Sequence, residues 1–348
     1  MKPLRSPDWP AAALALAARI PRDRLQAEAC AAGERLRGSW AVAFSGGADS
    51  LALLLLLWAH WPERRTRLVA LHFNHRLRGK ASEADVAFCR RVCAALQVPI
   101  RVGAWSRKKA SGKTSEAEAR KVRHDFFQTE LRQLRSRGLW LGHQLDDVAE
   151  SMFMRLARGS GLGGLAAPRP VQPMTGDRVH LRPLLTLRKD ELAKALTEIR
   201  VPWREDASNA GADYFRNRVR ADVIPRWIEA AGRDALAGAA LSRTLIEEDD
   251  TALEGWVDEL DPFGSDGSMD LAKLGHRPVG LIRRVVRRWL NLHCPEIALS
   301  RQGFDSLLGL IRRGERSRFS LGNNGFALIA HGRVTFERTS RSKTRLRS

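Results

Sequence analysis

The sequence predicts an α/β protein: a parallel sheet covered by helices, followed by a smaller, mainly helical α+β domain. Between about residues 40 and 226, short apolar segments typical of buried strands alternate with longer segments of helical pattern. Residues 227–289 have a helical pattern, and the chain then alternates like a terminal hairpin. With 348 residues the chain is long enough for two cores. We therefore expect two domains, 1–226 and 227–348.

The expected strands of the first domain are short, apolar and each followed by a turn or a helix. They cover residues 41–44, 68–73, 98–102 and 139–142. The expected helices begin near Leu51, Ser82, Ser115, Leu145 and Lys189. The terminal hairpin is expected to pair 319–321 with 326–336, with its turn at 322–325.

The charge of the chain points to a polyanionic partner. Lys and Arg number 59 against 39 Asp and Glu, a formal net charge of +20. A coding bias would explain why Arg replaces Lys, but it does not explain the excess over acids. Neutralising phosphates and releasing their counterions drives association with nucleic acid. We therefore expect nucleic-acid binding.

Other features narrow the class of protein. Four scattered cysteines do not form a disulfide framework. The apolar run Leu51–Trp61 is far too short to span a membrane, and Ala11–Ala18 is expected to be a short helix and not a signal peptide. We expect a cytoplasmic protein that makes no membrane contact.

The segment Ser45-Gly46-Gly47-Ala48-Asp49-Ser50 follows the first strand and opens a helix. A helix N-terminus after a glycine turn is an anion site, because free backbone amides and the helix dipole both face the ligand. The two glycines allow close approach of phosphate, and the serines add hydroxyl donors. Asp49 would repel an anion, so its expected role is to hold Mg²⁺ against the phosphates. No Lys precedes Ser50, which excludes a Walker A loop.

This loop resembles the signature of the PP-loop ATP-pyrophosphatase superfamily, with its adenine nucleotide α-hydrolase-like fold. The resemblance implies that ATP is cleaved between the α and β phosphates and that an oxygen of the substrate is activated as an adenylate. The loop alone leaves tRNA thiolases, amidating synthetases and lysidine synthetases open.

Further segments resemble the lysidine synthetase family in particular. They occur in family order and are His72–Gly79, Glu116–Arg123, Gly142–Asp147, Arg155–Gly161, Glu205–Asn209 and Arg216–Arg220. The resemblance implies ATP and Mg²⁺ as cofactors, an isoleucine tRNA with a CAU anticodon as substrate, and free L-lysine as the second substrate. The basic second domain, 227–348, is then expected to bind the tRNA. A homodimer stays open.

Four residues are the candidates for the chemistry. Asp49 and Asp147 are expected to hold the metal, and Arg123 to offset charge on the α-phosphate. His143 follows a strand at the sheet edge that carries the loop and is expected to contact phosphate. The alternative is that these residues have ordinary structural roles. His143 would then cap a helix, Asp147 would be an acidic residue in the first turn of that helix, and Arg123 would be a solvated helix residue. The candidate substrate residues are Asp206, Asn209 and Arg216, for which turn chemistry is the alternative.

Three further features have competing interpretations. His72 and His75 are either part of the site or surface residues at a strand end. Gly159–Gly164 fits a dinucleotide-binding pattern, but it follows a helix and not a strand, so we expect a loop over the active site.

The rival functions are a tRNA thiolase and a non-catalytic RNA-binding protein. A thiolase needs catalytic cysteines or an iron–sulfur cluster. Cys89 and Cys93 are expected on a helix away from the phosphate loop, which disfavours that alternative.

Overall fold

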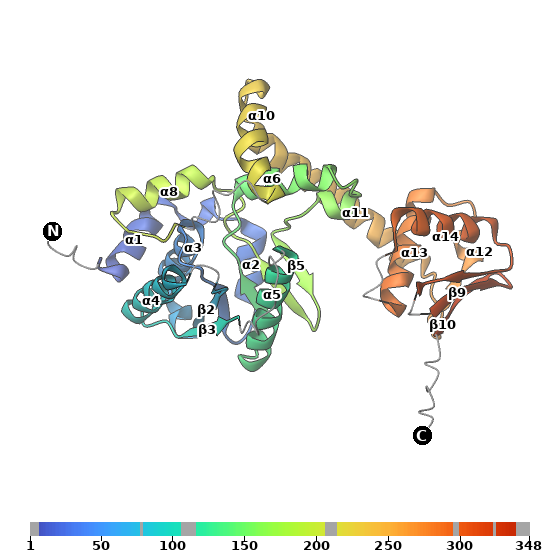
Figure 1. The fold of residues 1–348 in the computed structure, drawn as a ribbon, viewed down its shortest axis with the longest axis horizontal. Helices are drawn as coiled ribbons and strands as arrows, with labels where there is room; N and C mark the ends of the chain where they lie inside the picture. The colour runs from blue at the N-terminus through green and yellow to red at the C-terminus, as the bar shows by residue number, and fades with distance from the viewer. Residues whose placement is uncertain are drawn as a thin grey trace. The chain divides into compact units, whose positions relative to one another are not determined.

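The computed structural model describes residues 7–76, 79–105, 116–205, 214–294, 299–322 and 325–338. The chain divides into two compact units, Met1–Glu247 and Glu248–Ser348 (Figure 1). The first unit continues past the expected boundary at 226, because Ile224, Leu236 and Ala239 pack against the helix that begins at Leu145. No helix in the described part of the chain is long and apolar enough to cross a bilayer.

The first unit is built on a six-stranded sheet with the order β3-β2-β1-β4-β6-β5. Every neighbouring pair is parallel except β5 with β6, which is antiparallel. The strands are β1 (Trp40–Ala43), β2 (Leu68–Asn74), β3 (Ile100–Ala104), β4 (Gly138–Trp140), β5 (Val171–Met174) and β6 (Arg178–Leu181). The parallel sheet confirms the expected fold class. The edge strand β5 and its neighbour β6 were not predicted.

Helices cover both faces of this sheet because alternate strand residues are apolar on both sides. Trp40 and Val42 face a large core that includes the whole apolar run of α3, while Ala41 faces a smaller core with Leu131 and Leu139. On the first side α1, α3 and α8 lie next to one another (Figure 1). The helices that follow the strands or precede the sheet are α1 (Trp9–Arg19), α2 (Ala27–Arg35), α3 (Ala48–His60), α4 (Lys80–Ala95), α5 (Glu116–Gln133), α6 (Leu145–Leu156), α7 (Leu162–Leu165), α8 (Lys189–Glu198), α9 (Phe215–Arg218), α10 (Ile224–Ala231) and α11 (Ala235–Leu260).

The strand order places a topological switch point between β1 and β4. From β1 the chain moves outward to β2 and β3, and it then returns to the other side of β1 to form β4. In open α/β sheets, ligands bind in the crevice at the carboxyl ends of the strands at such a point. The loop after β1 and the segment after β4 therefore flank the expected ligand site.

The second unit packs helices against a four-stranded antiparallel sheet of order β7-β10-β9-β8 (Figure 1). Its core includes Trp289, Leu307, Ile329 and Val334. The expected hairpin was incomplete: the segment 326–336 is two strands joined at His331 and Gly332, both of which have positive φ. The elements are β7 (Met269–Asp270), α12 (Leu271–Leu274), α13 (Val279–His293), α14 (Arg301–Arg313), β8 (Ser317–Ser320), β9 (Gly325–Ala330) and β10 (Arg333–Arg338).

Candidate active site

The loop after β1 is a preformed turn closed by its own two serines. Gly46 has a φ of +90°, a left-handed conformation that favours glycine. The Ser45 and Ser50 hydroxyl oxygens lie 3.0 Å apart, and Ser50 also donates to the carbonyl of Gly47 at 3.0 Å. Gly47 is the N-cap of α3, with no side chain to satisfy the first amides of the helix. These amides are available to an anion at the carboxyl end of β1.

Asp49, in the first turn of α3, is the least satisfied group of the loop. Its Oδ1 atom is buried and has no hydrogen-bond partner. Burial, and next the negative charge of Asp147, raise the pKa of Asp49 to about 6. An unpaired carboxylate oxygen held near a second carboxylate fits a divalent cation, which would satisfy the oxygen and offset the repulsion. Within the described ranges no three His, Cys, Asp or Glu side chains are grouped so that they could hold a metal ion by themselves.

The segment after β4 is packed directly against the loop. A Cβ atom added to Gly142 would lie 3.0 Å from the carbonyl carbon and oxygen of Asp49. A glycine is therefore required for this close approach. Two residues on, Gln144 begins α6 with a capping box, in which the Gln144 amide donates to Asp147 Oδ2 at 2.9 Å.

Two buried carboxylates of α6 are paired with two arginines from the segment 214–220. Glu150 is 1% exposed and accepts Arg216 Nε at 2.8 Å and Arg220 Nη2 at 3.0 Å. Arg216 also donates to Asp147 Oδ1, and Arg220 Nη2 lies 3.8 Å from the same oxygen. The candidate metal ligand Asp147 and the candidate substrate residue Arg216 are thus joined in one ion-pair network.

His143 lies among positive charges. Its pKa is lowered well below the ordinary value, first by burial and next by the charge of Arg182, with smaller effects from Arg216, Arg123 and Arg120. The imidazole is therefore neutral, and the candidate residue Arg123 of α5 lies near enough to influence it. Cations gathered around a neutral His are typical of a site that receives an anion.

The segment 202–205 lies over the phosphate loop. The Arg204 amide donates to the carbonyl of Gly46 at 2.9 Å, and its Nε lies 2.6 Å from Asp85 Oδ1 on α4. Pro202, Trp203, Arg204 and Glu205 line a surface pocket beside this contact. The candidate substrate residues Asp206 and Asn209 follow directly, but they lie outside the described residues.

Around the loop, the structure decides one alternative that the sequence left open and contradicts one expectation. His72 is not a surface residue: it is 5% exposed and its Nδ1 lies 2.9 Å from the carbonyl oxygen of Phe44, at the end of β1. Cys89 is not away from the loop either. Its Sγ would lie 3.1 Å from a Cβ added to Gly46. Helix α4 packs against the turn at Gly46, and this contact could not be predicted from the spacing of residues in the sequence.

The sequence analysis also missed Arg182 and Arg204. Arg182 follows β6 and is 5% exposed, and it has three hydrogen-bond acceptors. The segment of Arg182 gave no signal of a buried guanidinium, and the segment of the partly exposed Arg204 gave no signal of a contact with the loop. The pattern at Gly159–Gly164 forms a turn and the short helix α7 after α6, so it lacks the strand that dinucleotide binding requires.

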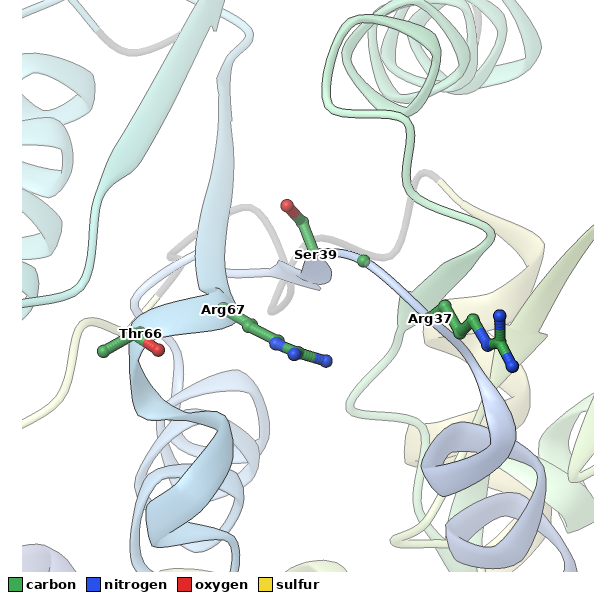
Figure 2. A pocket seen from close by; sticks show the side chains of 5 residues that line it. Arg37, Ser39, Thr66 and Arg67 are labelled. Atoms are coloured by element: carbon green, nitrogen blue, oxygen red, sulfur yellow. The ribbon is translucent and has the colours of Figure 1, made fainter.

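A second pocket lies at the opposite end of the sheet. It is lined by Arg37, Gly38, Ser39, Thr66 and Arg67, in the turns that lead into β1 and β2 (Figure 2). Ligands of open α/β sheets bind at the carboxyl ends of the strands, and this pocket is at the amino ends. It is therefore separate from the candidate active site.

The excess of positive charge belongs mainly to the first unit. Residues 1–247 contain 42 Lys and Arg against 26 Asp and Glu, whereas residues 248–348 contain 17 against 13. The formal net charge is therefore +16 for the unit that carries the phosphate loop and +4 for the second unit, which the sequence analysis expected to be the basic one.

These features define a PP-loop domain, and residues 23–227 match the family model of that name. A tRNA(Ile)-lysidine synthase of Polaromonas naphthalenivorans is 31% identical, over 84% of this chain and 86% of its own length. The one from Rhodopirellula baltica is 37% identical, over 65% of this chain and 62% of its own length. The chain belongs to the tRNA(Ile)-lysidine synthase family of PP-loop proteins.

Other comparisons show how much of the chain, and of the proteins it resembles, is covered by the similarity. The chain spans 58% of the tRNA(Ile)-lysidine synthase of Xanthomonas axonopodis pv. citri, with 35% identity over 74% of this chain. Among solved structures, a U34-tRNA thiolase from Methanococcus maripaludis with a [4Fe-4S] cluster has a TM-score of 0.51 and 16% identity, covering 68% of this chain and 78% of its own. At that identity the similarity shows the fold alone.

Proposed function

We propose that this chain is an ATP-dependent ligase that joins lysine to C2 of the wobble cytidine of isoleucine tRNA with a CAU anticodon. An adenylated cytidine is the intermediate, pyrophosphate and AMP are released, and the product is lysidine. The observation that carries the proposal is the buried, unpaired Oδ1 of Asp49 behind the two-glycine turn at the switch point. The names of the relatives support the choice of substrate.

In the first step the cytidine O2 attacks the α-phosphorus of ATP, and pyrophosphate leaves. The loop amides from Gly47 onward hold phosphate oxygens, and Arg123 offsets the charge that develops on the α-phosphate. Asp49 and Asp147 would hold Mg²⁺, which supplies charge neutralisation to the phosphates when bound. For Asp147 to do so, Arg216 must share or release its Oδ1.

In the second step the lysine ε-amine attacks base carbon C2, and AMP leaves with the electrons of the C2–O2 bond. An amine with an ordinary pKa of about 10.4 is protonated at neutral pH, so a proton must be removed first. Asp206, Asn209 and Arg216 are the residues proposed to contact the base or the lysine. The target base must leave its stack to reach them.

The thiolase alternative is disfavoured by the state of the thiols. Burial holds the pKa of Cys89 far above its ordinary value and raises the pKa of Cys93 to about 12. A protonated, enclosed thiol is a poor nucleophile. We also propose that residues 227–348 contribute to gripping the tRNA, and that the reaction takes place in the cytoplasm.

The test is incorporation of labelled lysine into RNA. The protein is incubated with ATP, Mg²⁺, radiolabelled lysine and the isoleucine tRNA, and label retained in RNA is counted. We expect label in this tRNA and none when the wobble cytidine is replaced by uridine. Label that appears equally in both, or in neither, contradicts the proposed substrate.

A further inference from the structure

The environment of His143 contains a residue that neither the sequence motifs nor the proposed mechanism uses. Arg182 follows strand β6 and is 5% exposed. Within the described part of the chain no carboxylate lies within ion-pair distance of its guanidinium. It is held by neutral acceptors instead: Nη1 donates to the carbonyl of Arg169 at 2.7 Å and Nη2 to Gln172 Oε1 at 2.8 Å.

The third contact of Arg182 is to His143. The Nε–H group of Arg182 points at Nδ1 of His143, 3.3 Å away. A guanidinium has donors and no acceptor, so Nδ1 must be the acceptor and cannot carry a proton. A neutral imidazole then has its single proton on Nε2.

The other ring nitrogen is left available. Within the described residues, no protein group forms a hydrogen bond with Nε2 of His143. This atom is also not one of the buried side-chain atoms that lack a hydrogen-bond partner. His143 directly follows Gly142, whose backbone lies against Asp49 and the start of α3. An Nε2–H at this place is a donor for an anion.

We propose that Arg182 is a positioning residue that holds His143 in the neutral Nε2–H tautomer, so that the ring donates a hydrogen bond to the reacting phosphate. The role of the tautomer in catalysis rests on the proposed function, whereas the tautomer itself does not. Arg182 also keeps a positive charge beside the ring, which disfavours a second proton. The other titratable groups near the ring, which also disfavour a second proton on it, are Arg120 and Arg123 of α5, His180 of β6 and Arg216 of α9.

The first test is the ¹⁵N NMR spectrum of histidine-labelled protein, with the His143 signals assigned by their loss in His143→Gln. At neutral pH we expect a pyridine-like Nδ1 and a protonated Nε2. Arg182→Met should give a mixture of tautomers, and Arg182→Lys, which keeps a charged donor, should restore most of the preference. A protonated Nδ1 in the unsubstituted protein, or a His143 signal unchanged in Arg182→Met, would overturn the proposal.

Two control variants separate positioning from folding. Gln172→Leu removes another hydrogen-bond partner of Arg182 without changing His143. Arg178→Met removes an arginine at the start of β6, which donates hydrogen bonds to Gln128 and to the carbonyl of Thr175. Both should leave the tautomer unchanged. If either control shifts it as much as Arg182→Met does, the effect is structural and the proposal fails.

The second test is kinetic. Arg182→Met should slow tRNA-dependent pyrophosphate release by roughly 10- to 100-fold. This is the usual scale for residues that orient a functional His through a hydrogen bond to its second ring nitrogen. The same change added to His143→Gln should slow it no further, because the two residues act as one unit. Additive losses would overturn the proposal. Absence of pyrophosphate release in the unsubstituted protein would contradict the proposed function and leave the NMR result to decide the role of Arg182.

Discussion

Replacing Asp49 by Asn should make the free protein more stable while it removes the activity. The pKa of the Asp49 carboxyl is about 6 in the folded chain against an ordinary value of 3.8, with burial as the first cause. Above pH 6 the folded protein therefore contains an ionised Asp49 carboxylate in surroundings that destabilise the ionised form. A difference of roughly two pH units, at about 1.4 kcal/mol each, corresponds to about 3 kcal/mol.

The pH dependence gives the sign of the effect. The folded pKa lies above the unfolded one, so below about pH 4 both states bind the proton and Asp49 costs nothing. As pH rises from about 4 to about 6 the unfolded state loses its proton first, and the stability of the unsubstituted protein falls relative to Asp49→Asn. The advantage of the variant should grow from near zero at pH 4 to about 3 kcal/mol at pH 8.

The assay is urea unfolding of both proteins at pH 4, 6 and 8, with Asp125→Asn, an exposed carboxylate of α5, as the matched control. Binding of Mg·ATP should be lost in Asp49→Asn, while tRNA affinity should be nearly intact because the basic surface remains. A variant that is less stable than the unsubstituted protein at pH 8, or a gap that does not change with pH, would refute the reasoning about Asp49.

Three further changes have outcomes that follow from the geometry. Gly142→Ala should cost about 1–3 kcal/mol of stability in urea unfolding and weaken ATP binding in calorimetry, since its Cβ would press on the loop, whereas Gly238→Ala in α11, with nothing within 4 Å, should lower neither. Glu150→Gln should lower the free energy of unfolding by about 3 kcal/mol, because two arginines lose their shared buried carboxylate; an unchanged urea midpoint would contradict this. Replacing Cys89 and Cys93 together by Ser should leave lysine incorporation within a few-fold of normal, and complete loss in a folded variant would revive the thiolase alternative.

Much of the first unit follows from local sequence patterns. The strand 40–43, the two glycines after it and the apolar run of α3 could be predicted, because these segments follow one another in the sequence. Each has a residue pattern that is typical of its own structure. The parallel α/β pattern predicted that His143 lies at the sheet edge that carries the loop, whereas the direct pairing of β4 with β1 was not predicted.

What could not be predicted depends on how distant segments pack. Strand β6 has polar residues at Arg178 and His180 and lies near the sheet edge, so its pattern is weak. That α4 brings Cys89 beneath the loop is decided by its packing on the sheet. The buried guanidinium of Arg182 has no local signal either, since all three of its acceptors come from residues 10 to 39 positions away.

The most direct test of the central claim is exchange of radiolabelled pyrophosphate into ATP. If the turn after β1 holds Mg·ATP so that its α-phosphorus is attacked by an RNA oxygen, exchange should require the isoleucine tRNA, proceed without lysine, and vanish in Asp49→Asn. Exchange that is equally fast without tRNA, or none at all with intact protein, ATP, Mg²⁺ and tRNA present, would contradict it.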